Sequence, residues 1–185
     1  MPPKVKITKE DIINTALELV RKNGVEAINA RSIAAALNCS TQPVFSNFRT
    51  MDELCEAVTV ASYEIYQSFL FREAESGKYP QYKSFGMAYI RFAKEEKELF
   101  KLLFMRNRKG KELIPTSDFD ASVEMIMKAN GVSKEKAELM HLEMWTCVHG
   151  IATMFASGFL DLEWELVSKM CTDMYLGLKM QYGVE

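Results

Sequence analysis

The sequence has few of the residues that metal sites, disulfide frameworks and membrane spans require. Its 185 residues include four cysteines, none in a C-x-x-C pair, and two histidines, so we expect neither a zinc site nor a disulfide framework. The most apolar stretch, residues 148–160, contains His149, Ser157 and two glycines and is shorter than the ~20 residues that span a bilayer. The start, MPPKVKITKED, lacks the apolar core of a signal peptide. We therefore expect a cytoplasmic protein with no membrane association.

Motifs for catalysis are absent as well. The sequence contains no phosphate-binding glycine loop, no dinucleotide fingerprint and no paired-carboxylate motif. Cys147 and His149 are two positions apart, so on a helix they face different sides and do not form a nucleophile and base. We predict no catalytic residues, no metal ligands and no cofactor.

Proline is scarce and apolar residues recur with helical spacing, which predicts an all-α fold of about nine helices. The five prolines and most of the nine glycines fall at breaks between apolar patterns. We expect a helix-turn-helix domain of three helices in residues 1–50. Residues 51–185 are expected to form a helical-bundle domain for ligand binding and dimerisation.

Charge differs between these two parts. Residues 1–50 contain seven basic and four acidic residues, a net +3, and the remainder contains 16 basic and 21 acidic residues, a net −5. A basic segment on an acidic body suits a protein that touches phosphate at one end.

The first helix is expected to begin after Thr8, a good cap, and to stop at Gly24. Its buried stripe has the spacing i, i+3, i+4, i+7 and consists of Ile13, Ala16, Leu17 and Val20. A second, short helix is expected after Asn29. A third is expected from a cap at Ser40 to about Phe48, because a proline at position 43 is tolerated only in a first turn.

Further helices follow. Thr50 and Glu53 have the spacing of a capping box, which predicts a long helix that ends before Gly77. Residues 106–111 are expected to form a polar, solvated loop. The last two helices, predicted over 133–157 and about 163–182, are apolar on two faces. The second face is expected either to meet a second copy of the chain in a four-helix interface or to be buried inside the chain.

Residues 7–54, ITKEDIINTALELVRKNGVEAINARSIAAALNCSTQPVFSNFRTMDEL, resemble the DNA-binding segment of the tetracycline-repressor (TetR) family. The order and spacing of the landmarks agree without gaps from the Asn23-Gly24 helix end to Leu54. The resemblance implies a dimeric repressor that binds a near-palindromic double-stranded DNA operator and releases it when a small, mostly apolar effector binds. In such proteins the third helix enters the major groove.

The resemblance and the polar character of this segment select ten candidate DNA-binding residues. Gln42 has the amide that pairs with adenine, and Thr41 can contact a thymine methyl group or a base acceptor. The full set is Arg31, Ser40, Thr41, Gln42, Pro43, Phe45, Ser46, Asn47, Arg49 and Thr50. Lys4 and Lys6 form a basic arm. Similar proteins usually have Tyr and Lys where this chain has Phe45 and Met51, so two phosphate contacts typical of the family are absent.

The C-terminal half resembles one subclass of TetR C-terminal domains, through the Trp145-Thr-Cys-Val-His149-Gly150 segment and KELFKLLF at 97–104. The resemblance implies a ligand cavity, for which the candidates are Phe104, Trp145, His149 and Met154. Such side chains at helical spacing are also typical of plain core. The candidates for the dimer interface are Met144, Ile151, Phe155, Leu166, Met170 and Met174.

An alternative function is a helical ligand-binding or partner-binding protein that has lost specific DNA binding. Pro43, Phe45 and Met51 motivate this alternative. Salt-dependent retention on DNA or heparin distinguishes the two, since only the repressor predicts it.

Overall fold

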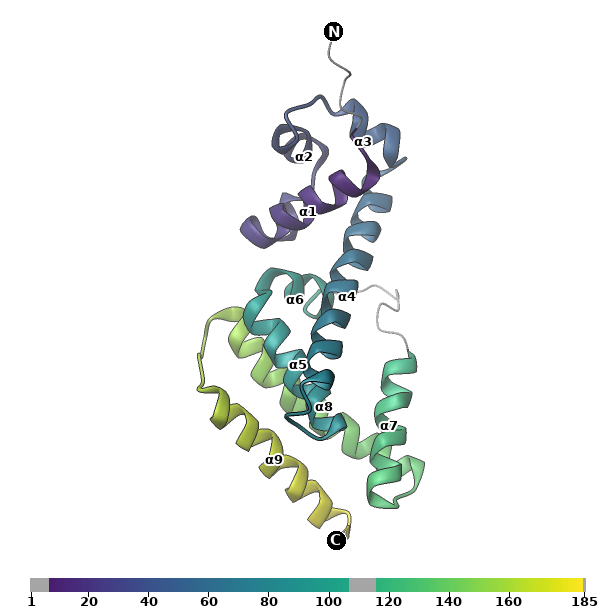
Figure 1. The fold of residues 1–185 in the computed structure, drawn as a ribbon, viewed down its shortest axis with the longest axis vertical. Helices are drawn as coiled ribbons and strands as arrows, with labels where there is room; N and C mark the ends of the chain where they lie inside the picture. Colours follow the sequence, from purple (N-terminus) through teal and green to yellow (C-terminus); the bar gives the residue numbers. More distant parts are fainter. Residues whose placement is uncertain (1–6, 107–115, 185) are drawn as a thin grey trace. The chain divides into compact units, whose positions relative to one another are not determined.

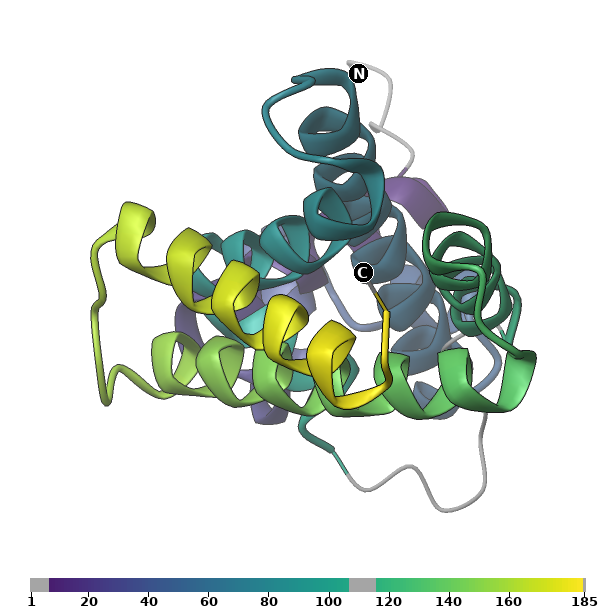
Figure 2. The same cartoon turned by 90° about the horizontal axis from the view of Figure 1, so that it is seen from below.

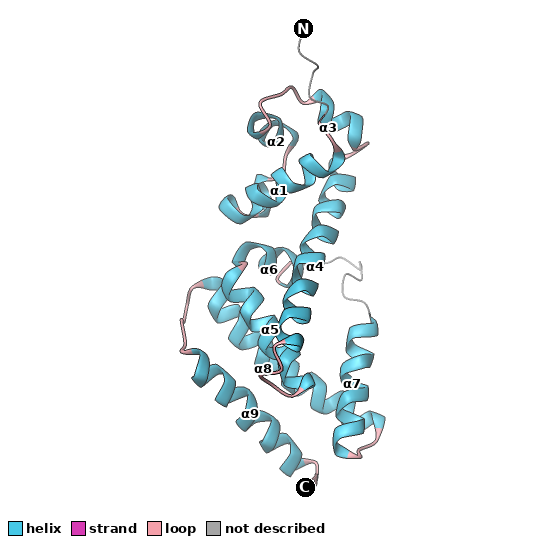
Figure 3. Cartoon of the chain, in the orientation of Figure 1, coloured by secondary structure: helices cyan, strands magenta, loops and turns pink. Residues whose placement is uncertain are grey.

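A computed structural model describes residues 7–106 and 116–184, and all regular structure within these ranges is helical (Figures 1 and 3). This confirms the predicted all-α fold. The helices are α1 (Lys9–Asn23), the short 3-10 helix η1 (Val25–Ala27), α2 (Ala30–Ala36), α3 (Gln42–Asn47), α4 (Met51–Glu75), α5 (Gln81–Glu95), α6 (Lys97–Phe104), α7 (Thr116–Asn130), α8 (Lys134–Ser157) and α9 (Trp164–Gln181).

The described residues form two compact units. The first comprises residues 7–66 and 96–106, and the second comprises residues 67–95 and 116–184. This division reflects packing alone and does not test the predicted boundary between two functional domains at residue 50, which stays a prediction. The predicted polar loop at 106–111 lies outside the described residues except for Arg106.

Helix α1 begins as the sequence predicts. The Thr8 hydroxyl oxygen accepts a hydrogen bond from the Asp11 backbone N–H at 3.1 Å, and the Asp11 carboxylate accepts one from the Thr8 backbone N–H at 2.8 Å. The bond from the Thr8 N–H, together with one from the Thr8 hydroxyl at 2.7 Å, lowers the pKa of the Asp11 carboxyl group. The buried stripe differs at one position: Ile12 is fully buried, whereas Ile13 is half-buried. The helix ends at Gly24, whose φ of +77° favours glycine.

An ion-pair cluster joins α1 to α6 within the first unit. The Arg21 guanidinium donates from Nε to Glu96 Oε2 at 2.9 Å and from Nη2 to Glu96 Oε1 at 2.8 Å. It also bonds Glu18 at 2.7 Å. A bidentate guanidinium–carboxylate contact fixes orientation as well as distance, so it sets the register of α6 against α1.

The second unit is organised around α5 and α8, which run in the same direction. Two tyrosine–histidine hydrogen bonds link them: Tyr82 Oη to His141 Nδ1 at 2.9 Å and Tyr89 Oη to His149 Nδ1 at 2.8 Å. On α5, Met87, Ile90 and Phe92 are fully buried, and the Phe92 ring lies 5.3 Å from that of Phe69 on α4 between centroids. This burial of apolar area is the main stabilising contribution in the unit.

Helix α9 packs against α8 and α5, and Figures 1 and 2 both show α8 and α9 lying alongside each other. The turn between them begins at Gly158, which is left-handed with φ +72°. The Lys83 ammonium on α5 bonds the hydroxyl groups of Ser168 and Thr172 on α9, each at 2.7 Å. These contacts orient one face of α9 inward.

A buried ion pair also belongs to the second unit. The Glu73 carboxylate, with a side chain only 7% exposed, accepts from Arg91 Nε at 2.9 Å. The Arg91 guanidinium lies over the Trp164 ring, 4.2 Å from its centroid, which connects α4, α5 and α9. Breaking such a pair leaves an uncompensated charge in a region of poor solvation.

We predict that the folded protein loses stability as the pH falls below about 6.5, the ordinary pKa of histidine. Burial lowers the pKa of His141 and His149, so the unfolded chain binds protons more readily than the folded one. The stabilisation is therefore fully present above this ordinary pKa and is lost as the pH falls below it.

Thermal unfolding measured between pH 7.5 and 5 tests this. The double variant His141→Phe/His149→Phe should have a flatter profile over that range. A profile of the same steepness in both proteins would contradict the assignment.

Candidate functional site

The chain breaks between α2 and α3, so residues 29–48 form two helices and not one rod (Figure 1). Helix α2 is capped by Asn29, whose side-chain oxygen accepts from the Ser32 N–H at 2.9 Å. After α2, Asn38 adopts a positive φ of 50°, the only such residue other than glycine in the described part of the chain. Asparagine tolerates this region better than most residues. The predicted helix-turn-helix is confirmed.

The predicted cap at Ser40 is wrong. Helix α3 begins at Gln42, its N-cap position is Thr41, and no side-chain cap hydrogen bond is made. Pro43 contributes to this, because a cap accepts from the N–H two or three residues later and proline supplies no N–H at the second of these positions. Pro43 does occupy the first turn of α3, as predicted.

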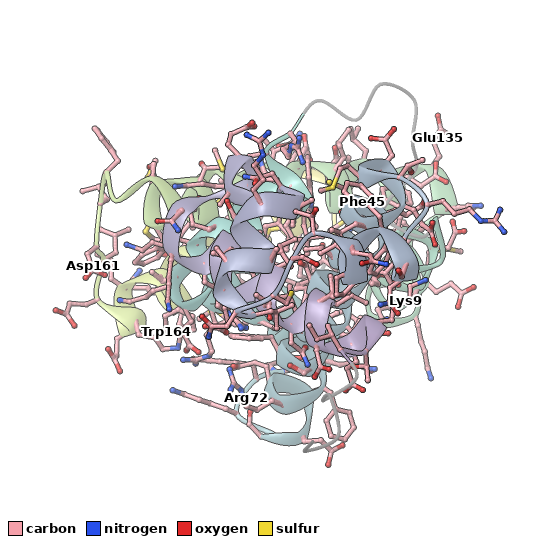
Figure 4. All side chains as sticks on the ribbon, turned by 90° about the horizontal axis from the view of Figure 1, so that it is seen from above. Lys9, Phe45, Arg72, Glu135, Asp161 and Trp164 are labelled. Atoms are coloured by element: carbon pink, nitrogen blue, oxygen red, sulfur yellow. The ribbon has the colours of Figure 1, made fainter. Side chains whose placement is uncertain are left out.

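Helix α3 has one buried and one exposed face. Val44 and Phe48 are both 1% exposed and pack into the first unit, and the Lys9 ammonium lies 4.7 Å from the centroid of the Phe48 ring. Gln42, Phe45 and Ser46 are exposed. Figure 4 labels Phe45 and Lys9 among the side chains of this unit. We call the surface formed by Gln42, Phe45 and Ser46 the outer face of α3.

Two predicted DNA-binding side chains on α3 are engaged within the protein. The Ser46 hydroxyl donates to the Gln42 carbonyl at 2.9 Å. The Asn47 amide donates to the Pro43 carbonyl at 2.8 Å and more weakly to the Ile7 carbonyl at 3.5 Å. Asn47 therefore ties α3 to Ile7, two residues before the start of α1. The Gln42 side chain makes no hydrogen bond to any other described residue.

The remaining candidates of the first unit are placed as follows. Arg31 and Arg49 are exposed and make no direct salt bridge with described residues. Thr50 caps α4, because its hydroxyl accepts from the Glu53 N–H at 3.1 Å. The Glu53 carboxylate reaches the Arg49 N–H at 2.8 Å, and this bond lowers the pKa of Glu53. Lys4 and Lys6 lie outside the described residues.

The four predicted ligand-pocket residues are not all in one unit. Phe104 is in the first unit, 5.3 Å from Tyr66 and 5.2 Å from Phe100 between ring centroids. Trp145, His149 and Met154 are on α8. The Trp145 and His149 rings stack with centroids 4.9 Å apart, and Met154 is exposed. The structure brings Trp145 and His149 together with Tyr89.

An open groove of about 390 Å³ lies within the first unit, between the end of α1 and α6. Its lining residues are Asn23, Gly24, Val25, Glu26, Glu98, Lys101, Leu102, Met105 and Arg106. None of the four predicted pocket residues lines it.

The predicted dimer residues divide between two environments. Met144, Ile151 and Phe155 are 6%, 3% and 3% exposed in the single chain. They are buried within the single chain and therefore have little surface to offer a partner, so their place in a dimer interface stays a prediction. Three others on α9 are exposed and four residues apart: Leu166, Met170 and Met174.

Sequence reasoning omitted exposed apolar residues from the dimer candidates. On α8 the exposed ones include Leu139 and Leu142, which are three residues apart, and Trp145 follows at the same interval. Leu142 and Trp145 lie on one of the two apolar faces that the sequence predicts for this helix. Periodicity alone did not decide which stripe faces α5.

Within the described ranges, no group of three or more metal-binding side chains is close together, and no helix combines the length and hydropathy of a bilayer span.

Comparison with known proteins gives the following relations. Residues 82–173 match the family described as "Tetracyclin repressor-like, C-terminal domain". No curated protein sequence is significantly similar to the chain. A protein of unknown function from Rhodococcus sp. RHA1 is 21% identical, with a TM-score of 0.76 over 96% of this chain and 98% of that one.

Two further solved structures have described roles. A TetR-like transcriptional regulator from Rhodococcus sp. RHA1 is 14% identical, with a TM-score of 0.70 over 99% of both chains. The multidrug binding protein EbrR, solved with imidazole, is 13% identical, with a TM-score of 0.62 over 90% of this chain and 93% of that one. The chain thus has the fold of TetR-like transcriptional regulators and their C-terminal domain. Such regulators are not enzymes, in agreement with the prediction.

The revised start of α3 predicts how two cap substitutions differ. Asn29→Ala removes a cap hydrogen bond and should lower the free energy of unfolding by about 1 kcal/mol. Ser40→Ala removes no cap and should change it by less than about 0.5 kcal/mol. Chemical denaturation of the two variants checks this, and an equal loss in both would show that Ser40 caps α3.

Proposed function

We propose that this chain, with the fold and C-terminal domain of TetR-like transcriptional regulators, is a cytoplasmic repressor that releases its operator when a small ligand binds. One observation carries the proposal. The short helix α3 is separate from α2, is anchored by Val44 and Phe48, and presents Gln42 outward with its amide unused. A free amide on an exposed helix face is suited to a bidentate contact with adenine in the major groove.

Phosphate contacts would complete the interface. Arg31 and Arg49 are exposed cations with no direct salt bridge to described residues, unlike Arg21 and Lys9, which bond Glu96 and Glu53. Contacts of this kind fix register and orientation on the duplex and do not read sequence. The absence of Tyr and Lys at positions 45 and 51 predicts a modest dependence of affinity on salt.

A homodimer would place two copies of α3 on one operator. The support is the outer side of α9, where Leu166, Met170 and Met174 are 47%, 37% and 42% exposed at four-residue intervals. Leu142 on the neighbouring α8 is 49% exposed. Two helices from each copy can bury these side chains in a four-helix interface. Half-sites about 34–36 Å apart would then be read together.

A mostly apolar effector would bind the C-terminal domain. Trp145, His149 and Tyr89 supply aromatic surface and a polar hydrogen-bonded pair on α8 and α5. A ligand that prefers a conformation with misplaced DNA-binding heads shifts the population away from the bound form. We also propose that this domain belongs to the subclass of TetR C-terminal domains that the segment from Trp145 to Gly150 resembles.

Gel retardation of the gene's own flanking DNA tests the function. Retardation at about 50 mM salt that weakens measurably at about 200 mM supports the repressor. Failure to retard any flanking fragment would favour the alternative, a ligand-binding protein without specific DNA binding.

For DNA binding, we predict that Arg31→Ala weakens affinity to a similar extent on all sequences. Loss of one phosphate contact should also reduce the slope of log affinity against log salt by about 0.9. The control Lys128→Ala removes an exposed cation from α7 and should leave the slope unchanged. Fluorescence anisotropy with a labelled duplex measures both, and equal slopes for all three proteins would remove Arg31 from the interface.

For assembly, we predict that Met170→Glu converts the dimer to a monomer at micromolar concentration. A glutamate at the centre of an apolar interface would be buried without a partner, which should raise the dimer dissociation constant by at least about 100-fold. Phe71→Glu is the matched control, because Phe71 is an exposed apolar residue on α4. Sedimentation equilibrium distinguishes them. A dimeric Met170→Glu protein would place the interface elsewhere.

A further inference from the structure

The outer face of α3 carries an exposed aromatic ring and no charge. Helix α3, Gln42–Asn47, contains no acidic or basic residue. Phe45 is 53% exposed, and among the described residues of the first unit it is the only exposed aromatic side chain. Removing the apolar surface of such a ring from water is favourable and lowers the free energy of a complex. Its partner in a complex should therefore be apolar.

Two of the polar side chains near the ring already donate hydrogen bonds within the protein and are therefore less available to bases. Ser46 donates its hydroxyl proton to the Gln42 carbonyl, and Asn47 donates its amide to the Pro43 carbonyl. Gln42 and Phe45 are three residues apart, so they are neighbours on the same face. The outer face thus combines one free amide with one apolar ring.

We propose that Phe45 is a specificity-determining residue that reads thymine through its C5-methyl group, beside an adenine bound by Gln42. The inference rests on the proposed DNA-binding function and extends it to the sequence that is recognised. The thymine methyl is the apolar group that base pairs present in the major groove, and phenylalanine is among the side chains that contact it.

Contact of the ring with the DNA backbone is less favourable. A phenyl ring has no proton to donate, and covering a phosphate with it would remove hydration without replacing the hydrogen bonds. A thymine methyl has no such hydration to lose. This chemistry favours the base edges as the partner of Phe45 and the phosphates as the partners of Arg31 and Arg49.

The experiment starts from duplexes that the full-length chain selects from a library with a randomised central segment. The enriched half-sites should contain thymine next to adenine. Each thymine in a half-site is then replaced by deoxyuridine, which keeps every hydrogen-bonding group and lacks only the methyl. Loss of one contacted methyl should weaken binding about fourfold. Deoxyuridine outside the half-sites should have no effect.

The Phe45→Ala variant identifies the residue that reads the methyl. It should bind the thymine and deoxyuridine duplexes equally, with an affinity near that of the unsubstituted chain on the deoxyuridine duplex. Since Phe45 is exposed, the variant should unfold at nearly the same temperature. Phe71→Ala, which removes an exposed ring from α4, should still discriminate between the two duplexes.

The outcomes separate the two proposals. No enrichment of any duplex would overturn the repressor function. Enrichment with equal affinity for thymine and deoxyuridine would overturn the reading of the methyl and leave DNA binding intact. Discrimination that persists in Phe45→Ala would assign the methyl contact to Thr41 or Pro43 and overturn the role of Phe45.

Discussion

The burial of Val44 and Phe48 is the interaction on which the DNA-binding arrangement depends. Helix α3 has only six residues, too few for a stable isolated helix, so tertiary packing must hold it in place. The two buried side chains, four residues apart, press one face into the first unit. This packing determines that Gln42 and Phe45 face outward. A substitution that weakens the packing of Val44 or Phe48 would therefore make the position and orientation of the outer face of α3 less well defined.

Much of the fold could be predicted from the sequence because the residues at which helices begin and end are determined by local chemistry. Thr8, Asn29 and Ser133 each cap a helix through a side-chain oxygen, and Gly24 and Gly158 take positive φ values where helices end. These features need no knowledge of distant contacts. The prediction of a cap at Ser40 is wrong because Pro43 locates the first turn of α3 without fixing the residue at which the helix begins, and it supplies no N–H for a cap three residues earlier.

The dimer candidates were harder to predict because helices α8 and α9 have apolar residues on two sides. Periodicity shows that both sides are apolar and does not show which one meets α5. The structure resolves this for Met144 and Ile151, which are buried within the chain. On α9, the bonds from Lys83 to Ser168 and Thr172 fix the inner side, and Met170 is left exposed. The choice of pocket residues likewise depends on tertiary packing, and Phe104 and Trp145 belong to different compact units.

The central claim is that the outer face of α3 enters the major groove of two half-sites. Chemical probing of the purified protein on a bound duplex tests it most directly. Purine N7 atoms lie in the major groove and adenine N3 atoms in the minor groove. The account predicts protection of N7 atoms in two tracts whose centres are about 10–10.5 base pairs apart, or a multiple of this, with N3 atoms between them still reactive. Protection of N3 atoms alone, or of a single tract, would contradict it.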